Sequence, residues 1–275
     1  GATNLITGIG SCFFDSIPCL FITGQVNTYE FKFDSPVRQV GFQETDIVKI
    51  VKPIVKDAVL VTDPDKIKYY LERSVHIARS GRPGPVSLDI PMNIQRADIN
   101  PESLESFYKS STDELLDEFD DAMVKQIVQL INSSFRPVVL VGGGVRLSKA
   151  QNELLKFIHK TGIPVVTSLM GLDAFLHNDQ LFVGMIGSYG NRYANLAIAN
   201  SDLVLALGTR LDTRQTGTMP ETFARGAKVV HVDIDPYELN NKIKVDFPIN
   251  FDVKKFLCML NNYISKYDKN KIQSW

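Results

Sequence analysis

Strand-like and helix-like stretches alternate through both halves of this 275-residue chain. Short continuous apolar runs, such as residues 137–141 and 203–207, end at glycine or polar turns and are separated by longer stretches with helical spacing. Such runs are typical of strands buried on both faces of a parallel sheet. The alternation therefore predicts an α/β fold with two doubly wound parallel-sheet domains, in which ligands bind beyond the carboxyl ends of the strands.

The predicted elements fall into two passages separated by one polar stretch. The first passage predicts strands at 19–23, 58–61 and 86–90, a helix at 44–54, and a helix between the Asp63-Pro64 cap and Gly81. The second predicts strands at 137–141, 164–167, 203–207 and 228–233, and helices at 122–132, 149–160, 191–200 and 253–264. Because residues 98–120 are polar and acidic, we expect a linker there. The expected domains are residues 1–97 and 121–265, followed by a tail at 266–275.

The first residues predict a helix with no strand before it and no initiator methionine, on Leu5, Ile6, Ile9 and Phe13. An α/β layer normally has such a strand to cover the apolar face of the helix. We therefore expect an N-terminal truncation and an incomplete first domain. Residues 20–22 and 86–90 would then expose apolar surface, which predicts an oligomer, either a homodimer or a homotetramer.

Composition excludes several classes of partner. The formal net charge is −1 with no long run of like charge, so no binding to nucleic acid or to a membrane surface is expected. No apolar run is long enough to cross a bilayer, and no signal peptide is recognisable. The three cysteines, Cys12, Cys19 and Cys258, lack metal-ligand spacing. We expect reduced thiols and a cytoplasmic location.

Three glycines, Gly142–Gly144, follow the predicted strand at 137–141 and precede a helix that Ser148 is expected to cap. Glycines in such a turn let backbone N–H groups approach a phosphate, and a helix N-terminus favours negative charge. The run does not match Gly-x-Gly-x-x-Gly, so the standard dinucleotide motif is absent. From these residues alone, a nucleotide-binding turn and a plain tight turn both remain open.

Charged residues follow two further predicted strands. After residues 203–207, the loop carries Arg210, Asp212 and Arg214, and two guanidinium groups with a carboxylate between them can hold a pyrophosphate. A surface cluster of ion pairs is the alternative. Strand 228–233 ends in Asp233, where an acid commonly binds ribose hydroxyls, whereas Asp235 before a proline is expected to cap a helix. Three loops at one sheet edge therefore favour nucleotide binding.

Two motifs of the first passage are ambiguous from the residues alone. Gln43 can bond a substrate, while Glu44 can merely favour the N-terminus of the predicted helix. The turn around Arg82, between two prolines, presents an exposed cation. The four histidines lie on separate predicted elements and form no ligand pair, so no metal site is expected in this chain.

Several longer motifs occur in one order and carry a resemblance that covers nearly the whole chain. The first half resembles the pyrimidine-binding domain, and the second half the Rossmann-like central domain, of thiamin-diphosphate enzymes of the acetolactate synthase group. The first-half motifs are Gly1-Ala2-Thr3-Asn4-Leu5, Asp15-Ser16-Ile17-Pro18, Ile22-Thr23-Gly24-Gln25, Phe42-Gln43-Glu44, 80–86 and Asp89-Ile90-Pro91. The second-half motifs are Leu169-Met170-Gly171-Leu172, Tyr193-Ala194-Asn195, 208–217 and 231–236.

The resemblance implies an enzyme that decarboxylates a small 2-keto acid on thiamin diphosphate and Mg²⁺ and passes the product to an acceptor. It assigns active-site positions to Asn4, Phe42 and Gln43. It also implies a site for FAD that takes no net redox part, with ADP or no ligand as alternatives. The residues assigned to that site are Arg82, Gly142, Gly143, Gly144, Ser168, Leu169, Met170, Gly208, Arg210, Asp212, Arg214, Asp233, Ile234, Asp252 and Val253.

Some positions depart from the family pattern. Met92 stands where the family has a lysine, Thr213 where it has an acid, and Ser188-Tyr189 where it has Met-His. These departures lie on the substrate side, so we expect an acetolactate synthase-like enzyme of unassigned substrates. The family's activating glutamate and its metal–diphosphate segment match no part of the chain, so we expect the chain alone to be inactive.

A second hypothesis comes from another class of protein. Rossmann-like domains of this type also occur in non-catalytic NAD-binding modules. Such a module would bind NAD, and its gene would encode no thiamin-binding segments. The coding sequence on either side of this chain would separate the two hypotheses.

Overall fold

The computed structural model describes residues 1–109, 120–264, 267–272 and 275. The chain divides into two compact units, Gly1–Leu115 and Leu116–Trp275. Within the described residues, no helix has the length and apolar character needed to cross a membrane. Both units are α/β structures with parallel sheets, which confirms the predicted fold class.

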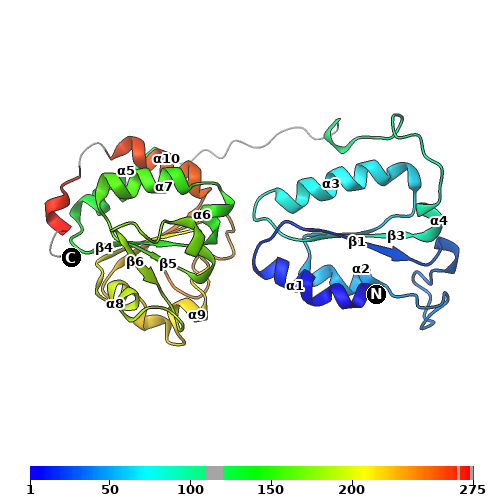
Figure 1. Cartoon of the computed structure of the whole chain (residues 1–275), viewed down its shortest axis with the longest axis horizontal. Coiled ribbons are helices and arrows are strands. Elements are labelled where there is room, and N and C mark those ends of the chain that lie inside the picture. The colour runs from blue at the N-terminus through cyan, green and yellow to red at the C-terminus, as the bar shows by residue number, and fades with distance from the viewer. Residues whose placement is uncertain (110–119, 265–266, 273–274) are drawn as a thin grey trace. The chain divides into compact units, whose positions relative to one another are not determined.

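The part of the first unit that the structure describes, residues 1–109, is a three-stranded parallel sheet in the order β1-β3-β2 with helices on both faces. The longest helix, α3, covers one face, and α1 and α2 cover the other (Figure 1). The strands are β1 (Leu20–Gln25), β2 (Asp57–Leu60) and β3 (Val86–Pro91). The helices are α1 (Ile6–Phe14), α2 (Ile47–Val51), α3 (Ile67–Arg79) and α4 (Met92–Gln95), with 3₁₀ turns η1 (Ala2–Leu5), η2 (Thr28–Glu30), η3 (Lys52–Ile54), η4 (Pro64–Lys66) and η5 (Phe107–Lys109).

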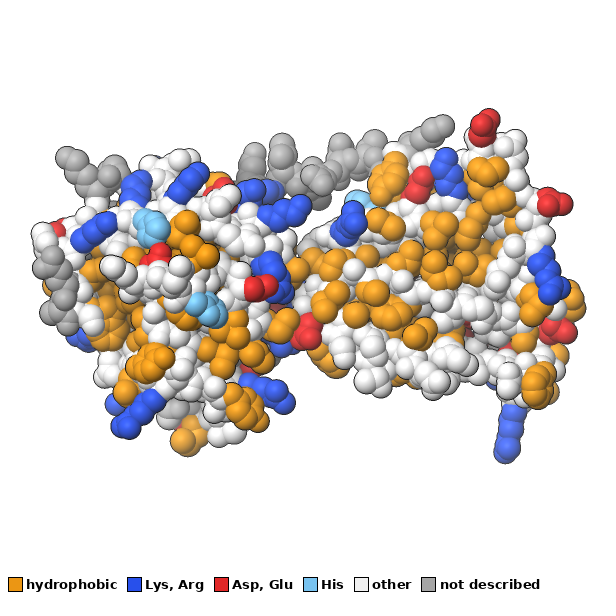
Figure 2. All heavy atoms as spheres, in the orientation of Figure 1, with side chains coloured by type: hydrophobic (Ala, Val, Ile, Leu, Met, Phe, Trp, Pro, Cys, Tyr) orange, Lys and Arg blue, Asp and Glu red, His pale blue; other side chains and the backbone are white. Residues whose placement is uncertain are grey.

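Every residue of the central strand of the first unit except Ile90 is buried. Val86 and Leu88 of β3 have no exposed surface, since β3 lies between two strands and two helical layers. The prediction that residues 86–90 expose apolar surface is therefore wrong. The prediction holds for β1 at the sheet edge, where Ile22 is 54% exposed. Figure 2 shows hydrophobic side chains gathered along this edge of the unit.

In its described residues, the second unit contains six parallel strands in the order β6-β5-β4-β7-β8-β9. Helices α5, α7 and α10 cover one face, and α8 covers the other (Figure 1). The strands are β4 (Pro137–Val141), β5 (Val165–Thr167), β6 (Phe182–Met185), β7 (Leu203–Leu207), β8 (Lys228–Asp233) and β9 (Phe247–Asn250). The helices are α5 (Asp121–Ser133), α6 (Gly143–Leu147), α7 (Gln151–Thr161), α8 (Arg192–Asn200), α9 (Thr213–Thr216) and α10 (Val253–Tyr263), with 3₁₀ turns η6 (Leu169–Ala174), η7 (Pro220–Thr222) and η8 (Lys269–Ile272).

The central strands β4 and β7 are apolar on both faces because each face of the sheet has its own core. On β4, Val139 and Val141 join the cluster formed with α5, α7 and α10. The alternate residues Val138 and Leu140 join the cluster formed with α8. This period of two, with no polar face, explains why the strand reads as a continuous apolar run. The C-terminal Trp275 also packs on this unit, where its Nε1 donates to the carbonyl of Pro137 at 3.1 Å.

The structure corrects two predicted helix starts. Ser148 does not cap the helix predicted at 149–160: it ends the short helix α6, and α7 begins at Gln151. The helix predicted from residue 44 begins at Ile47, with Asp46 as its side-chain cap. In both cases the first residues of the predicted helix instead form a turn that precedes the observed helix. Strands β6 and β9 were not predicted.

Candidate functional site

The carboxyl ends of all six parallel strands of the second unit lie at one edge of the sheet. This edge brings together the candidate residues that follow β5, β4, β7, β8 and β9, because parallel strands end on the same side. They are Ser168, Leu169 and Met170 after β5, Gly142–Gly144 after β4, Gly208–Arg214 after β7, Asp233 and Ile234 at β8, and Asp252 and Val253 after β9. The strand order thus places the predicted candidate residues at one edge of the sheet, which a shared binding crevice requires.

The glycines after β4 and β7 pack backbone against backbone. The N–H of Gly142 donates to the carbonyl of Leu207 at 2.9 Å, and the N–H of Gly144 donates to that of Gly208 at 2.9 Å. A Cβ on Gly144 would lie 2.6 Å from the Cα of Gly208, closer than side chains approach. These two amides are engaged by the neighbouring loop, and the assignment of Gly142–Gly144 to a cofactor site stays a prediction. Glycine is required here by the contact between the two turns.

The loop after β7 is organised by Asp212. Its Oδ1 accepts from the backbone N–H of Arg214 at 2.9 Å and of Gln215 at 3.2 Å, which caps α9. Its Oδ2 lies 3.5 Å from a guanidinium nitrogen of Arg210, and both side chains are about one third exposed. At that exposure and distance the ion pair is weak. The loop therefore presents two arginines at the sheet edge, with Asp212 holding the backbone between them.

The acids after β8 and β9 have local structural partners. The Oδ1 of Asp233 accepts from the N–H of Asp235 at 3.0 Å, and Asp252 caps α10 through the N–H of Lys255 at 2.9 Å. Asp235 is followed by turns instead of the helix predicted to begin there, and its Oδ1 accepts from the N–H of Tyr237 at 3.0 Å. Val253 is buried as the first residue of α10.

A buried histidine contacts the loop after β7, Gly208–Arg214, which we call the arginine loop. His231 on β8 is 1% exposed, and its Nε2 lies 2.7 Å from the carbonyl oxygen of Thr209. Because a carbonyl only accepts, Nε2 carries the proton, and Nδ1 has no partner among the described residues. Burial lowers the pKa of His231, and the bond to Thr209 only partly opposes this. The ring is therefore a neutral support for the backbone just before Arg210.

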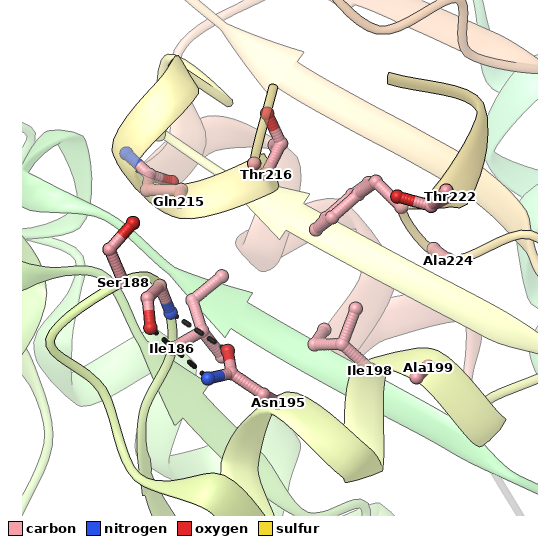
Figure 3. Close-up of a pocket in the computed structure, with 12 residues that line it drawn as sticks. Ile186, Ser188, Asn195, Ile198, Ala199, Gln215, Thr216, Thr222 and Ala224 are labelled. Atoms are coloured by element: carbon pink, nitrogen blue, oxygen red, sulfur yellow. Dashed lines mark hydrogen bonds between the residues drawn. The ribbon is translucent and has the colours of Figure 1, made fainter. Parts of the chain in front are cut away.

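A pocket opens beside the arginine loop on the α8 side of the sheet (Figure 3). It has a volume of about 270 Å³. Its apolar lining includes Ile186, Ile198 and Phe223, and its polar lining includes Ser188 and Gln215. The Oε1 of Gln215 accepts from Thr209 Oγ1 at 2.6 Å, so one wall of the pocket is tied to the arginine loop.

One side chain of the pocket fixes the loop after β6. The Oδ1 of Asn195 accepts from the N–H of Gly187 at 2.8 Å, and its Nδ2 donates to the carbonyl of Gly187 at 3.1 Å. Figure 3 draws both bonds as dashed lines from α8. The next residue, Ser188, donates its N–H to the carbonyl of Arg214 at 2.8 Å. The loops after β6 and β7 are thus joined directly.

The candidate residues of the first unit lie on turns at its surface. Asn4 is exposed in η1, and Phe42 and Gln43 are exposed just before α2. The Nε of Arg82 donates to the Oγ of Ser16 at 2.9 Å, within the same unit. Glu44, expected to favour a helix start, is instead buried and accepts three backbone N–H groups.

Gly171, Asn195 and Gln215 entered the sequence prediction only within family motifs and were assigned no place in the site. A Cβ on Gly171 would lie 2.3 Å from the carbonyl oxygen of Val141, so this glycine seals the turn after β4. Asn195 and Gln215 bind partners 8 and 6 residues away, across loops, and such contacts have no periodic signal. The sequence contained the motif Phe42-Gln43-Glu44. The partners of the Glu44 carboxylate depend on how residues 32–41 fold and could not be predicted from the motif.

Comparison with known proteins finds a family model for the second unit and relatives over nearly the whole chain. Residues 124–260 match the family model "Thiamine pyrophosphate enzyme, central domain". Acetolactate synthase 2, chloroplastic, of Nicotiana tabacum is 41% identical over 99% of this chain and 40% of its own length. The acetolactate synthase large subunit of Corynebacterium glutamicum is 39% identical over 100% of this chain and 43% of its own length.

The plant enzyme from Arabidopsis thaliana, acetolactate synthase, chloroplastic, is 39% identical over 96% of this chain and 38% of its own length. The chain thus spans about two fifths of the length of these relatives, and the similarity extends through both of its units. Residues 124–260 thus belong to the central-domain family of thiamine pyrophosphate enzymes, and both units of the chain are similar to acetolactate synthases.

Proposed function

We propose that this chain is part of a thiamin-diphosphate-dependent enzyme that decarboxylates a small 2-keto acid and joins the product to an acceptor. The similarity to acetolactate synthases over both units supports this reaction class. Thiamin diphosphate would supply an electron sink for the decarboxylation. Among the described residues, no three His, Cys, Asp or Glu side chains gather as a metal site.

The second unit would bind an adenine nucleotide, FAD first of all, at the carboxyl edge of its sheet. The observation that carries this proposal is the pair of arginines on the loop after β7, at the edge where the glycine turns and Asp233 also lie. Guanidinium groups match the geometry of phosphate oxygens, which favours a pyrophosphate there. The donors present fit such a ligand, and the flavin would serve the fold without net redox chemistry.

Titration of the purified chain with FAD, ADP and NAD tests this site. We expect saturable binding of FAD or ADP, and at least tenfold weaker binding in Arg210→Ala. The matched control is Arg136→Ala, because Arg136 lies before β4 at the opposite end of the strands, where its Nε donates to the carbonyl of Asn200. The control should bind like the parent. No binding of FAD or ADP at high micromolar concentration would contradict the proposal, and binding of NAD alone would favour a non-catalytic module.

The reaction itself requires a longer protein. The coding sequence on either side of this chain should encode a thiamin-activating glutamate upstream and a Gly-Asp-Gly metal–diphosphate segment downstream. The enzyme expressed with these segments should release CO₂ from a 2-keto acid in the presence of thiamin diphosphate and Mg²⁺. Absence of both segments would exclude the proposed reaction.

We also propose that the enzyme is a homodimer or homotetramer. The exposed apolar side chains near β1, including Phe14, Ile17 and Ile22, support an interface on the first unit. Sedimentation of the chain at increasing concentration tests this association. An aspartate in place of Ile22 should weaken it, whereas a monomer at every concentration in the parent would contradict it.

A further inference from the structure

The exposed dipeptide Phe42-Gln43 is followed directly by two anchor points of the first unit, the side chain of Glu44 and the carbonyl of Thr45. Phe42 is 87% exposed, and Gln43 has a backbone φ of +60°. A glutamine in this left-handed region is strained and persists only where the surroundings fix it. The residues on both sides of the dipeptide therefore determine how it is presented.

The first anchor is the carboxylate of Glu44, which is 7% exposed. Its Oε1 accepts from the N–H of Lys32 at 2.8 Å, and its Oε2 accepts from the N–H groups of Val40 at 2.8 Å and Gly41 at 3.2 Å. One side chain thus closes the loop from residue 32 to residue 41. Burial tends to raise the pKa of Glu44, but the three N–H donors and the charge of Lys32 lower it overall. The carboxylate is therefore held ionised in this turn.

The second anchor holds the carbonyl of Thr45, the residue after Glu44. The Nε2 of Gln25 donates to this carbonyl at 2.7 Å and to the Oδ2 of Asp89 at 2.8 Å. Asp89 is 1% exposed and also accepts from the Oγ1 of Thr23 at 2.7 Å. Burial raises the pKa of Asp89, although both side-chain donors oppose the rise. This buried network connects the loop to β1 and β3.

Close packing leaves the turn little freedom to rearrange. Gly41 is buried, and a Cβ there would lie 2.9 Å from the carbonyl oxygen of Glu30. Glu30 itself closes a capping box with Asn27. Gly41, next to Phe42, is therefore packed against the η2 turn, which its own capping box stabilises.

We propose that Glu44 is a positioning residue that fixes the backbone presenting Phe42 and Gln43 to the reaction site. The Gln25–Asp89 pair fixes the residue that follows. This inference rests on the proposed function for the part that concerns catalysis, since Phe42 and Gln43 are its candidate active-site residues. We call the three hydrogen bonds that the Glu44 carboxylate accepts the clamp. The clamp does not depend on the proposed function, so the clamp and the catalytic role can be tested separately.

Hydrogen exchange of the purified chain tests the clamp without any activity. In Glu44→Gln the side-chain NH₂ would face backbone N–H donors, so amides in residues 31–44 should exchange at least tenfold faster. The matched control is Glu72→Gln, because Glu72 also accepts a backbone N–H, from Phe107 at 2.8 Å, elsewhere in the same unit. The control should leave residues 31–44 unchanged. Unchanged exchange in Glu44→Gln would overturn the clamp.

Kinetics of the longer, active protein test the positioning role. Glu44→Gln should lower kcat at least tenfold while KM changes less than threefold, and the double variant with Gln43→Ala should be no slower than Gln43→Ala alone. A parental kcat in Glu44→Gln would overturn the positioning role. If the parent protein does not decarboxylate a 2-keto acid, the proposed function and the catalytic role of Glu44 both fail. The hydrogen-exchange result then shows whether the hydrogen bonds of Glu44 still hold the turn.

Discussion

A Cβ atom on Gly142 would lie 2.1 Å from the carbonyl oxygen of Gly208, which no relaxed structure permits. The two residues follow β4 and β7, neighbouring strands of the second unit. Gly208 also has a φ of +55°, where side chains are strained. The turns after the two central strands therefore form one packed backbone unit, and the arginine loop is built on it.

Replacement of Gly142 by alanine should disturb both turns at once. Because the added methyl would meet backbone and not a flexible side chain, we expect a loss of about 1–3 kcal/mol in the free energy of unfolding. Nucleotide affinity should fall as well, since the arginine loop moves. Gly226→Ala is the control, because its Cβ would meet nothing closer than 3.9 Å. Equal stability of the two variants in urea unfolding would contradict the packing argument.

Asp212 should contribute to stability through its cap more than through its ion pair. Asp212→Ala removes the acceptor for the N–H of Arg214, which should cost about 1 kcal/mol. Asp212→Asn retains an acceptor oxygen, so its unfolding free energy should stay close to the parental value. Chemical unfolding of both variants and FAD titration check this. An Asn variant as unstable as the Ala variant would mean that the charge, not the cap, matters.

The buried His231 should make the second unit sensitive to acid. Burial places its folded-state pKa below the ordinary value of 6.5, so the unfolded chain binds the proton more readily. The stabilising contribution is complete above pH 6.5 and is lost as pH falls below it, by at most about 1.4 kcal/mol per pH unit. His231→Gln lacks this titration, so its free energy of unfolding should fall less than the parental value between pH 7.5 and 5.5. Parallel pH curves would refute the assignment.

Much of the second unit could be predicted because its central strands are buried on both faces. Residues 137–141, 203–207 and 228–233 were predicted with the bounds that β4, β7 and β8 have. The edge strands β6 and β9 were missed. Phe182–Met185 contains Gly184, and Phe247–Asn250 contains Pro248, and neither pattern shows a buried apolar run. These edge strands are only partly buried, which leaves a weaker signal in the sequence.

The meeting of the candidate residues at one edge of the sheet could also be predicted, but the local partners of these residues could not. The carboxyl edge follows from the order of strands and loops. That Asp252 caps α10, or that Glu44 reaches back to Lys32, depends on turns whose shape is set by contacts between distant residues. A short polar side chain has many partners within reach, and only the folded backbone selects one.

Asn195 should control the order of the loop after β6. Its amide both accepts from and donates to Gly187, whose φ of +104° is accessible only to glycine. In Asn195→Asp the donor to the Gly187 carbonyl becomes a charged acceptor, so the two oxygens repel each other. Amide exchange at Gly187 and Ser188 should then accelerate, and stability should fall by about 1 kcal/mol.

Asn200→Asp is the matched control for Asn195→Asp, since Asn200 lies on the same helix and donates to the carbonyl of Leu196 at 2.8 Å. It introduces the same charge without touching the loop after β6, so exchange at Gly187 and Ser188 should stay parental. Because Ser188 donates its N–H to Arg214, loosening this loop should also weaken FAD binding. Faster exchange in both variants would point to the charge on α8 as the cause, and the bridge from Asn195 to Gly187 would then have no specific role.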